Sequence, residues 1–227
     1  MKVDMNLVEV AAKHAEALLA PLGNRWRHVQ GVVEKACSVS RIFEAEDQPY
    51  LLAAAYLHDI GYAPSLKKTG FHPLDGANDV LQSFGNKHLA SLVAYHSEAQ
   101  FEAELRGYGQ ALHEFPHERS AVADALTYCD MTTSPTGSNI SFEERIADIL
   151  HRYGDKDIVA QALCQATPSL SLDVERTQHM LRQRGLSHEI KPSHVMYGFA
   201  IDNKTVQQLQ QRVQQPPQTY TKTDQHW

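Results

Sequence analysis

Six side chains of metal-binding types lie where the sequence is otherwise apolar or where a helix is expected to begin: His28, His58, Asp59, His72, His96 and Asp130. The last two residues of the helix that carries the apolar run at 51–55 are His58 and Asp59, and a carboxylate there is costly unless a cation or hydrogen bonds compensate it. Imidazole nitrogens and carboxylate oxygens suit iron, manganese, zinc or nickel better than magnesium. The pattern therefore points to a transition-metal site.

Each of these residues also has an ordinary interpretation when it is taken alone. A single histidine on an apolar helix face, such as His28 or His96, is usually a core residue whose ring bonds a backbone carbonyl. Asp130 could accept hydrogen bonds at a helix end, and His72 could serve only as a helix cap. The metal interpretation requires that the whole set converge in the folded chain, as side chains from crossing helices can.

Apolar residues recur at helical spacing through most of the chain, and this periodicity predicts an all-α fold. Asn86 and Ser141 are expected to cap helices, Gly61 to end one, and Asp155 to start one that stops before Pro168. Helices are expected over residues 5–20, 25–43, 49–59, 73–84, 87–96, 118–131, 142–153, 155–166 and 168–184.

Two stretches differ from this helical pattern. Residues 99–117 are less periodic and are expected to form a partly ordered insertion over one end of the bundle. Residues 195–201 could form a short extended segment, and residues 205–215 a Gln-rich helix followed by a mobile tail. We therefore expect residues 1–186 to form a helical bundle and residues 187–227 to form a small C-terminal extension, an arm that could mediate a homodimer.

The composition is that of an ordinary globular protein, with 42% hydrophobic and 21% charged residues among 227. A formal net charge of −6 argues against binding to a nucleic-acid polymer. No apolar run reaches the ~20 residues that cross a membrane, and the first residues carry an acid and no apolar core, so no signal peptide is expected. Three widely spaced cysteines without a Cys-x-x-Cys motif indicate reduced thiols and a cytoplasmic location.

The order of the candidate ligands resembles that of the HD-domain metal-dependent phosphohydrolase superfamily, in particular its small stand-alone, HDIG-like members. The resemblance covers roughly residues 24–135 and implies an HD-domain helical bundle. Each motif is short, but their order and helical placement together make a specific signal. The motifs are Arg27-His28-Val29, Leu57-His58-Asp59-Ile60-Gly61, Gly70-Phe71-His72-Pro73-Leu74-Asp75-Gly76-Ala77, Ala94-Tyr95-His96 and Tyr128-Cys129-Asp130.

The resemblance also implies how the ligands are shared between metal ions. A first ion would be held by four residues, His28, His58, Asp59 and Asp130. A second ion would be held by His72 and His96, with Asp59 bridging the two. One or two divalent transition-metal ions (iron, manganese, nickel or zinc) are therefore expected, and a dinuclear centre is favoured.

Two positions depart from the superfamily members that carry the HD-GYP signature. Those members usually have a lysine where this chain has Tyr62, and a second histidine where this chain has Ser97. The resemblance therefore does not imply hydrolysis of cyclic dinucleotides.

The ligand set points to hydrolysis of a phosphate ester. Water bound to such an ion loses its proton near neutral pH, and two ions ~3.5–4 Å apart can also polarise a phosphoryl oxygen. We expect a metal-dependent phosphohydrolase whose metal-bound hydroxide attacks a phosphomonoester or phosphodiester of a small metabolite or nucleotide, with Asp59 as the catalytic residue. Lys68 and its neighbour Lys67 could contact the substrate phosphate, and His113 and His117 could line the entrance or supply a proton.

Two other functions are compatible with the same residues. Some HD-fold proteins with the full set of six ligands use a mixed-valence di-iron centre to activate dioxygen, so an oxygenase acting on a small polar substrate is the first alternative. A non-catalytic sensor or binding module is the second, although loss of ligands would be its mark and none of the six is missing here. Metal identity and oxygen consumption separate the first alternative from hydrolysis.

Overall fold

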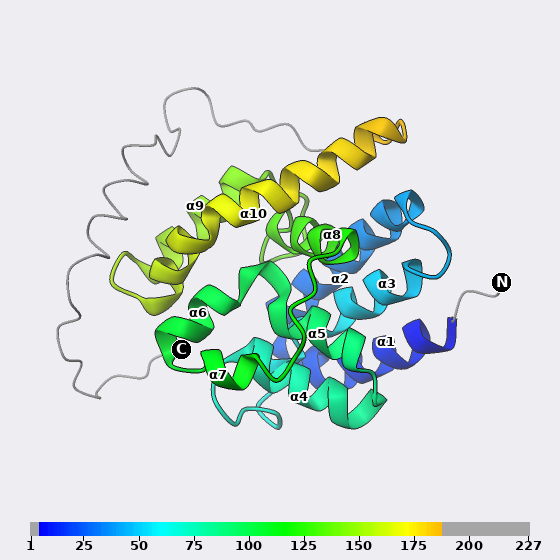
Figure 1. The fold of residues 1–227 in the computed structure, drawn as a ribbon. Helices are drawn as coiled ribbons and strands as arrows, with labels where there is room; N and C mark the ends of the chain where they lie inside the picture. Colours follow the sequence, from blue (N-terminus) through cyan, green and yellow to red (C-terminus); the bar gives the residue numbers. More distant parts are fainter. Residues whose placement is uncertain (1–4, 188–227) are drawn as a thin grey trace, which may run out of the picture.

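The computed structural model describes residues 5–187 as helices joined by short connections (Figure 1). The all-α prediction is confirmed, and the only extended pairing in this part of the chain is an isolated antiparallel bridge between Thr133 and Asn139. No helix within residues 5–187 is both long and apolar enough to cross a membrane. The segments predicted at 195–201 and 205–215 lie outside the described residues, and the domain boundary after residue 186 stays a prediction.

The helical segments follow one another in the order expected, with single-turn 3₁₀ segments at several of their ends. The α-helices are α1 Met5–Leu19, α2 Asn24–Val39, α3 Gln48–Leu57, α4 His72–Phe84, α5 Lys87–Tyr95, α6 Gln100–Arg106, α7 Gly109–Leu112, α8 Ala121–Met131, α9 Phe142–Tyr153 and α10 Ile158–Gln183. The 3₁₀ segments are η1 Ala20–Leu22, η2 Ser40–Ile42, η3 Ile60–Tyr62 and η4 His96–Glu98.

Two predicted caps are confirmed at the starts of α5 and α9. The side-chain oxygen of Asn86 accepts the Leu89 amide at 3.0 Å. The Ser141 hydroxyl accepts the Glu144 amide at 3.2 Å, and the Glu144 carboxylate accepts the Ser141 amide at 2.7 Å, which completes a capping box. These caps satisfy amide groups that the first helical turn leaves without partners.

The prediction of two helices on either side of Pro168 is wrong. A single helix, α10, passes through Pro168, and Asp157 rather than Asp155 caps it by accepting the Val159 amide at 2.8 Å. Proline removes one backbone hydrogen bond, but its side chain points to the exposed side of α10. The opposite face of α10 carries an apolar stripe that is buried both before and after the proline, and this burial outweighs the lost hydrogen bond. The stripe consists of Leu163, Ala166, Leu170 and Val174.

The expected partly ordered insertion at 99–117 is instead well packed. Two short helices, α6 and α7, occupy it and bury Ala103, Leu112 and Phe115. The Tyr95 hydroxyl donates to the Leu112 carbonyl at 3.1 Å, which joins this region to the end of α5. The apolar residues here are few and irregularly spaced, so the sequence period does not reveal that Ala103, Leu112 and Phe115 are buried.

The core consists of a larger and a smaller apolar cluster. In the larger cluster α3 packs against α1, α2, α5 and α8. The smaller cluster joins α8, α9 and α10, which lie together on one side of the molecule (Figure 1), and contains Met131, Ile146, Ile149, Leu163, Ala166 and Leu170. The end of α8 therefore belongs to both parts of the core.

The sequence predicts that Gly61 ends a helix, and this prediction is wrong. Gly61 instead allows a close backbone contact. Helix α3 ends at Leu57, and Gly61 lies within η3 against the first turns of α4. A Cβ atom on Gly61 would lie 2.0 Å from the carbonyl oxygen of His72 and 2.7 Å from the amide nitrogen of Gly76. This contact brings the segment that follows α3 directly onto the residue that opens α4.

Substituting Gly61→Ala should destabilise the fold, because the new methyl group meets backbone atoms that cannot move independently. Overpacking of this kind costs about 1–3 kcal/mol, and urea unfolding followed by circular dichroism measures it. The control is Gly85→Asn: this glycine has φ +61° with open space around its Cβ position, a conformation that asparagine tolerates. A Gly61→Ala protein as stable as wild type would contradict the close packing described here.

Candidate metal centre

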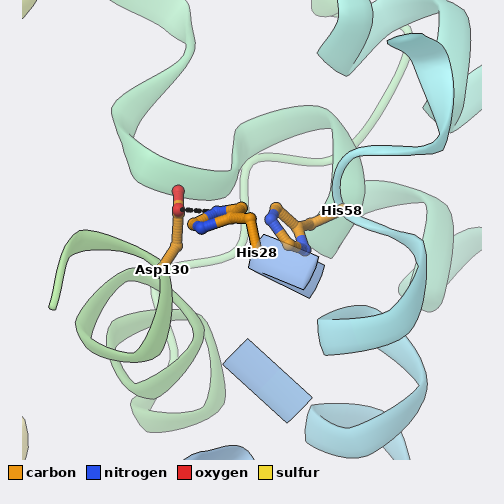
Figure 2. Close-up of side chains that lie close together, drawn as sticks. All are labelled: His28, His58 and Asp130. Atoms are coloured by element: carbon orange, nitrogen blue, oxygen red, sulfur yellow. Dashed lines mark hydrogen bonds and ion pairs between the residues drawn. The ribbon is translucent and has the colours of Figure 1, made fainter. Parts of the chain in front are cut away.

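The six predicted ligands come from separate segments and meet inside the bundle. Their donor atoms form two groups, and within each group these atoms lie within 4.8 Å of one another. The first group is contributed by α2, by the residue after α3 and by α8: His28, His58 and Asp130 (Figure 2). The second comes from the same turn after α3, the start of α4 and the start of η4: Asp59, His72 and His96.

The first group is centred on His28. In Figure 2 its ring lies between the other two side chains, and its Nε2 atom is 2.9 Å from Oδ1 of Asp130. The ring centroids of His28 and His58 are 5.6 Å apart. All three residues are buried, so the charge on Asp130 is held away from solvent.

Asp59 directs one oxygen toward each group. Its Oδ1 atom is 3.4 Å from Nε2 of His72, and its Oδ2 atom is 3.4 Å from Nε2 of His58. Oδ2 also lies 3.8 Å from Nε2 of His28. On the far side of the second group, the Nε2 atoms of His72 and His96 are 3.2 Å apart. Asp59 thus lies in the position that a bridging carboxylate needs.

Backbone carbonyl groups fix the ring orientation of three of the histidines. The Nδ1 atoms of His28, His58 and His96 bond the backbone oxygens of Ser134, Ala55 and Val93 at 3.0, 2.9 and 2.6 Å, respectively. Because a carbonyl oxygen only accepts hydrogen bonds, each Nδ1 atom carries a proton. In the neutral ring, Nε2 therefore presents a lone pair to the centre, which is how metal-binding histidines are commonly oriented.

The Nε2 atom of His58 shows most directly that the site fits a cation. This atom is buried and has no hydrogen-bond partner among residues 5–187. An unpaired buried polar group costs about 1–3 kcal/mol. The groups around this atom are the Asp59 carboxylate and the lone pairs of other imidazole rings. None of these groups can donate a hydrogen bond to Nε2 of His58. A positive ion would interact favourably with Nε2 and with all of these groups.

Both carboxylates are held in their charged form. Burial alone would raise the pKa of Asp59, but the Arg25 guanidinium, whose Nη1 atom is 2.6 Å from Oδ2, and the neighbouring His58 hold that pKa well below its usual range. Burial also opposes ionisation of Asp130, and the adjacent His28 ring, whose Nε2 atom lies 2.9 Å from Oδ1, outweighs it, so this pKa too is well below its usual range. The centre therefore holds two buried negative charges.

The histidines differ in how readily they take up a proton. Burial lowers the pKa of His72 well below its usual value and lowers that of His96 as well, so both rings are neutral and able to bind a metal. Burial also acts to lower the pKa of His58, but the charge of Asp59 outweighs it and the pKa is raised. A proton therefore competes with a metal ion at His58.

Two contacts hold α2 against the turn that follows α8. The buried Lys35 side chain donates to the backbone oxygen and to the hydroxyl of Thr132. A Cβ atom on Gly31 would lie 2.3 Å from the carbonyl oxygen of Gly137, so the two backbones touch at this point. The same turn supplies the Ser134 carbonyl oxygen that orients the histidine of α2.

The backbone directly after His96 is strained. Ser97 has φ +50° and Glu98 has φ +58°, a region that residues other than glycine adopt at a cost of about 1–3 kcal/mol. This conformation lets the Ser97 hydroxyl donate to Oδ2 of Asp130 at 2.5 Å. Ser97, which stands where members with the HD-GYP signature usually have a histidine, thus holds the candidate ligand Asp130 in place.

A cavity of about 130 Å³ opens onto both groups, and three arginines line it: Arg25, Arg145 and Arg152. Arg25 stacks on the Tyr62 ring, 3.9 Å from its centroid, and Tyr62 in turn stacks on His72. Arg145 is buried, and its Nε atom has no hydrogen-bond partner within residues 5–187. The cavity therefore combines the candidate ligands with cationic groups suited to an anion.

The cations at the cavity are not the ones that the sequence suggests. The described residues that line the cavity do not include any of the four that the sequence suggests, namely Lys67, Lys68, His113 and His117. The backbone amides of the loop at 68–70 donate to the Asp75 carboxylate, which anchors that loop on α4. Lys68 does not line this cavity, and its contact with a substrate stays a prediction. The signal that could have identified Arg25 is its position one helical turn before His28.

The fold and the donor set define an all-helical protein with a candidate dinuclear metal centre. The family model described as the HD domain matches residues 25–153, which is more than half of the chain. The chain belongs to the HD-domain family, and the resemblance seen in its motifs is confirmed. Members of this family are mostly metal-dependent phosphohydrolases. Comparisons with curated proteins and with solved structures gave no match.

Loss of Asp59 should remove metal from both groups, because its two oxygens face both. Protein loaded with Mn²⁺ or Fe²⁺ and freed of excess metal should retain ions in the wild type and lose most of them in Asp59→Ala. Mass spectrometry of the released metal gives the stoichiometry. The control His179→Ala, on the exposed side of α10, should retain as much metal as wild type. Equal metal content in Asp59→Ala and wild type would rule out this ligand assignment.

Metal affinity should fall as the pH is lowered, because the raised pKa of His58 keeps a proton on its ring to a higher pH than for an ordinary histidine. Below that pKa the metal must displace the proton, and above it the competition disappears. Calorimetric titration in buffers of different ionisation enthalpy measures the protons released. In His58→Gln the proton release should decrease. Metal binding with the same affinity from about pH 5 to 8 would contradict this assignment.

Proposed function

We propose that this protein is a metal-dependent phosphohydrolase that cleaves a phosphomonoester or phosphodiester of a small metabolite or nucleotide. The observation that carries this proposal is the convergence of six metal-binding side chains beside a cavity that arginines also line. Membership of the HD-domain family supports the same class of reaction.

The donor set fits two divalent ions. One would be held by His28, His58 and Asp130, the other by His72 and His96, and Asp59 would contribute one oxygen to each. Neutral imidazoles and charged carboxylates suit iron, manganese, nickel or zinc. Such ions would supply Lewis acidity, which activates a water molecule and polarises a phosphoryl oxygen.

Asp59 is the residue that lies between the two groups. It is 3% exposed, and the hydrogen bond from Arg25 fixes its Oδ2 atom while Oδ1 faces His72. A carboxylate held in this way faces both groups at the same time. Arg25 is itself held between Asp59 and the ring of Tyr62, so it acts as a positioning residue for this carboxylate.

Arg145 is the group best placed to bind the substrate phosphate. Its Nη2 atom lies 3.7 Å from Oδ1 of Asp130 and its Nη1 atom 3.5 Å from Oδ2 of Asp148, so both contacts are long. Its Nε–H group lacks an acceptor within the described residues. A phosphate in the cavity would provide acceptors in the geometry that a guanidinium group matches.

Substitution of Arg145 should reduce turnover of the preferred substrate. A panel of phosphorylated metabolites and nucleotides, assayed for phosphate release with Mn²⁺, Fe²⁺ and Ni²⁺, should first identify that substrate. Arg145→Met should then lower kcat/KM on the order of 100-fold, since a donor to the developing charge is lost. Arg145→Lys should recover only part of this, because lysine lacks the planar fork. The control Arg182→Met, near the exposed end of α10, should behave as wild type.

The same assays separate hydrolysis from the oxygenase alternative. Phosphate release that proceeds at an unchanged rate without dioxygen supports the hydrolase. Substrate consumption that requires dioxygen and takes it up in stoichiometric amounts would overturn the proposal, and so would the absence of any reaction with fully metal-loaded protein across the panel.

A further inference from the structure

One wall of the cavity is built largely from a helix that lies beyond the part of the chain matched by the HD-domain family. The match ends at residue 153, the last residue of α9, and α10 begins at Ile158. Side chains from α10, together with one each from α8 and α9, form what we call the apolar wall: Met131, Ile149, Val159, Ala162, Leu163 and Ala166. Four of the six residues of this wall, those of α10, therefore lie beyond the part of the chain that the family model matches.

The apolar wall leaves room for a ligand because two of its residues are alanines. Ala162 and Ala166 are one turn apart on α10 and so lie on the same face of the helix. They are 4% and 3% exposed and both line the cavity. A larger side chain at either position would occupy part of the space of about 130 Å³.

The wall offers nothing with which a hydroxyl-rich group could bond. None of its residues carries a hydroxyl, an amide or a charge. The cavity is also lined by two glutamates, each of which accepts one hydrogen bond from a neighbour: Glu102 accepts from Nε of Arg106 at 2.6 Å, and Glu98 accepts from the Gln100 amide. A sugar placed against the wall would lose hydrogen bonds to water without replacing them, whereas an apolar group would gain from leaving water.

We propose that the substrate is a phosphate ester of a compact apolar alcohol or phenol, whose aryl or alkyl group lies against the apolar wall while the phosphate faces Arg145 and the candidate metal ligands. This inference rests on the proposed function and names the substrate class. Hydrolysis breaks the bond between phosphorus and the ester oxygen; water supplies a hydroxyl to phosphorus and a proton to the leaving oxygen. The products are inorganic phosphate and the apolar alcohol or phenol.

Non-hydrolysable probes test the inference by binding alone. Calorimetry on the metal-loaded, full-length protein compares phenylphosphonate, methylphosphonate and 2-hydroxyethylphosphonate, which share one charged head group. Phenylphosphonate should bind at least about tenfold more tightly than the other two, because only its ring contacts the apolar wall. Equal affinities for the three probes would overturn the inference.

Variants of α10 connect this preference to the wall. Ala166→Leu should remove the preference for phenylphosphonate while leaving metal content and methylphosphonate affinity close to wild type. Ala162→Val, a smaller change, should reduce the preference and covers the case in which the larger residue disturbs folding. Gln165→Leu adds leucine to α10 at a position that does not line the cavity and should keep the full preference. A preference that survives both alanine substitutions would also overturn the inference.

Failure of this inference can be distinguished from failure of the proposed function. Equal binding of the probes together with phosphate release from sugar phosphates would overturn the apolar substrate class and leave the hydrolase intact. A clear preference for phenylphosphonate that Ala166→Leu removes, with no phosphate release from any ester, would support the apolar wall and overturn hydrolysis.

Discussion

The structure depends on one electrostatic constraint: the lone pairs of histidine rings and the negative charges of two carboxylates lie close together in the buried centre of the bundle. Backbone carbonyl groups accept hydrogen bonds from the Nδ1–H groups of His28, His58 and His96, so the Nε2 atoms of these rings are directed inward. Asp59 and Asp130 add two buried carboxylates to the same space. Arg25 compensates part of this charge from one side. A divalent cation would satisfy the remainder, which would explain why a fold retains such a costly arrangement.

The surrounding helices hold this arrangement through contacts between backbones rather than through the ligands themselves. Gly61 brings the turn after α3 onto α4, and Gly31 brings α2 onto the turn after α8. The buried Lys35 fixes the same turn. The candidate ligands are thus positioned by the packing of the surrounding backbone, and such support favours a preorganised site.

The sequence predicts most of the helices and the candidate ligands, because apolar period and the order of His and Asp residues are local signals. It does not predict contacts that depend on tertiary packing. Pro168 suggests a helix break in the sequence. The helix continues because the apolar stripe of α10 is buried before and after the proline, and this burial exists only in the packed bundle. Lys68 suggests a phosphate contact because its loop is near the ligands in sequence, but it is not among the residues that line the cavity, and its loop is bonded to Asp75 of α4. Arg145 reaches the cavity only because α9 folds back onto α8.

The most direct test of the central claim is anomalous diffraction at the manganese absorption edge from crystals grown with Mn²⁺. The account predicts anomalous peaks at bonding distance from Nε2 of His28, His58 and His96, with Asp59 between the two positions. Crystals that show no anomalous density at these side chains at saturating Mn²⁺, while His58 Nε2 still faces the Asp59 carboxylate, would contradict it.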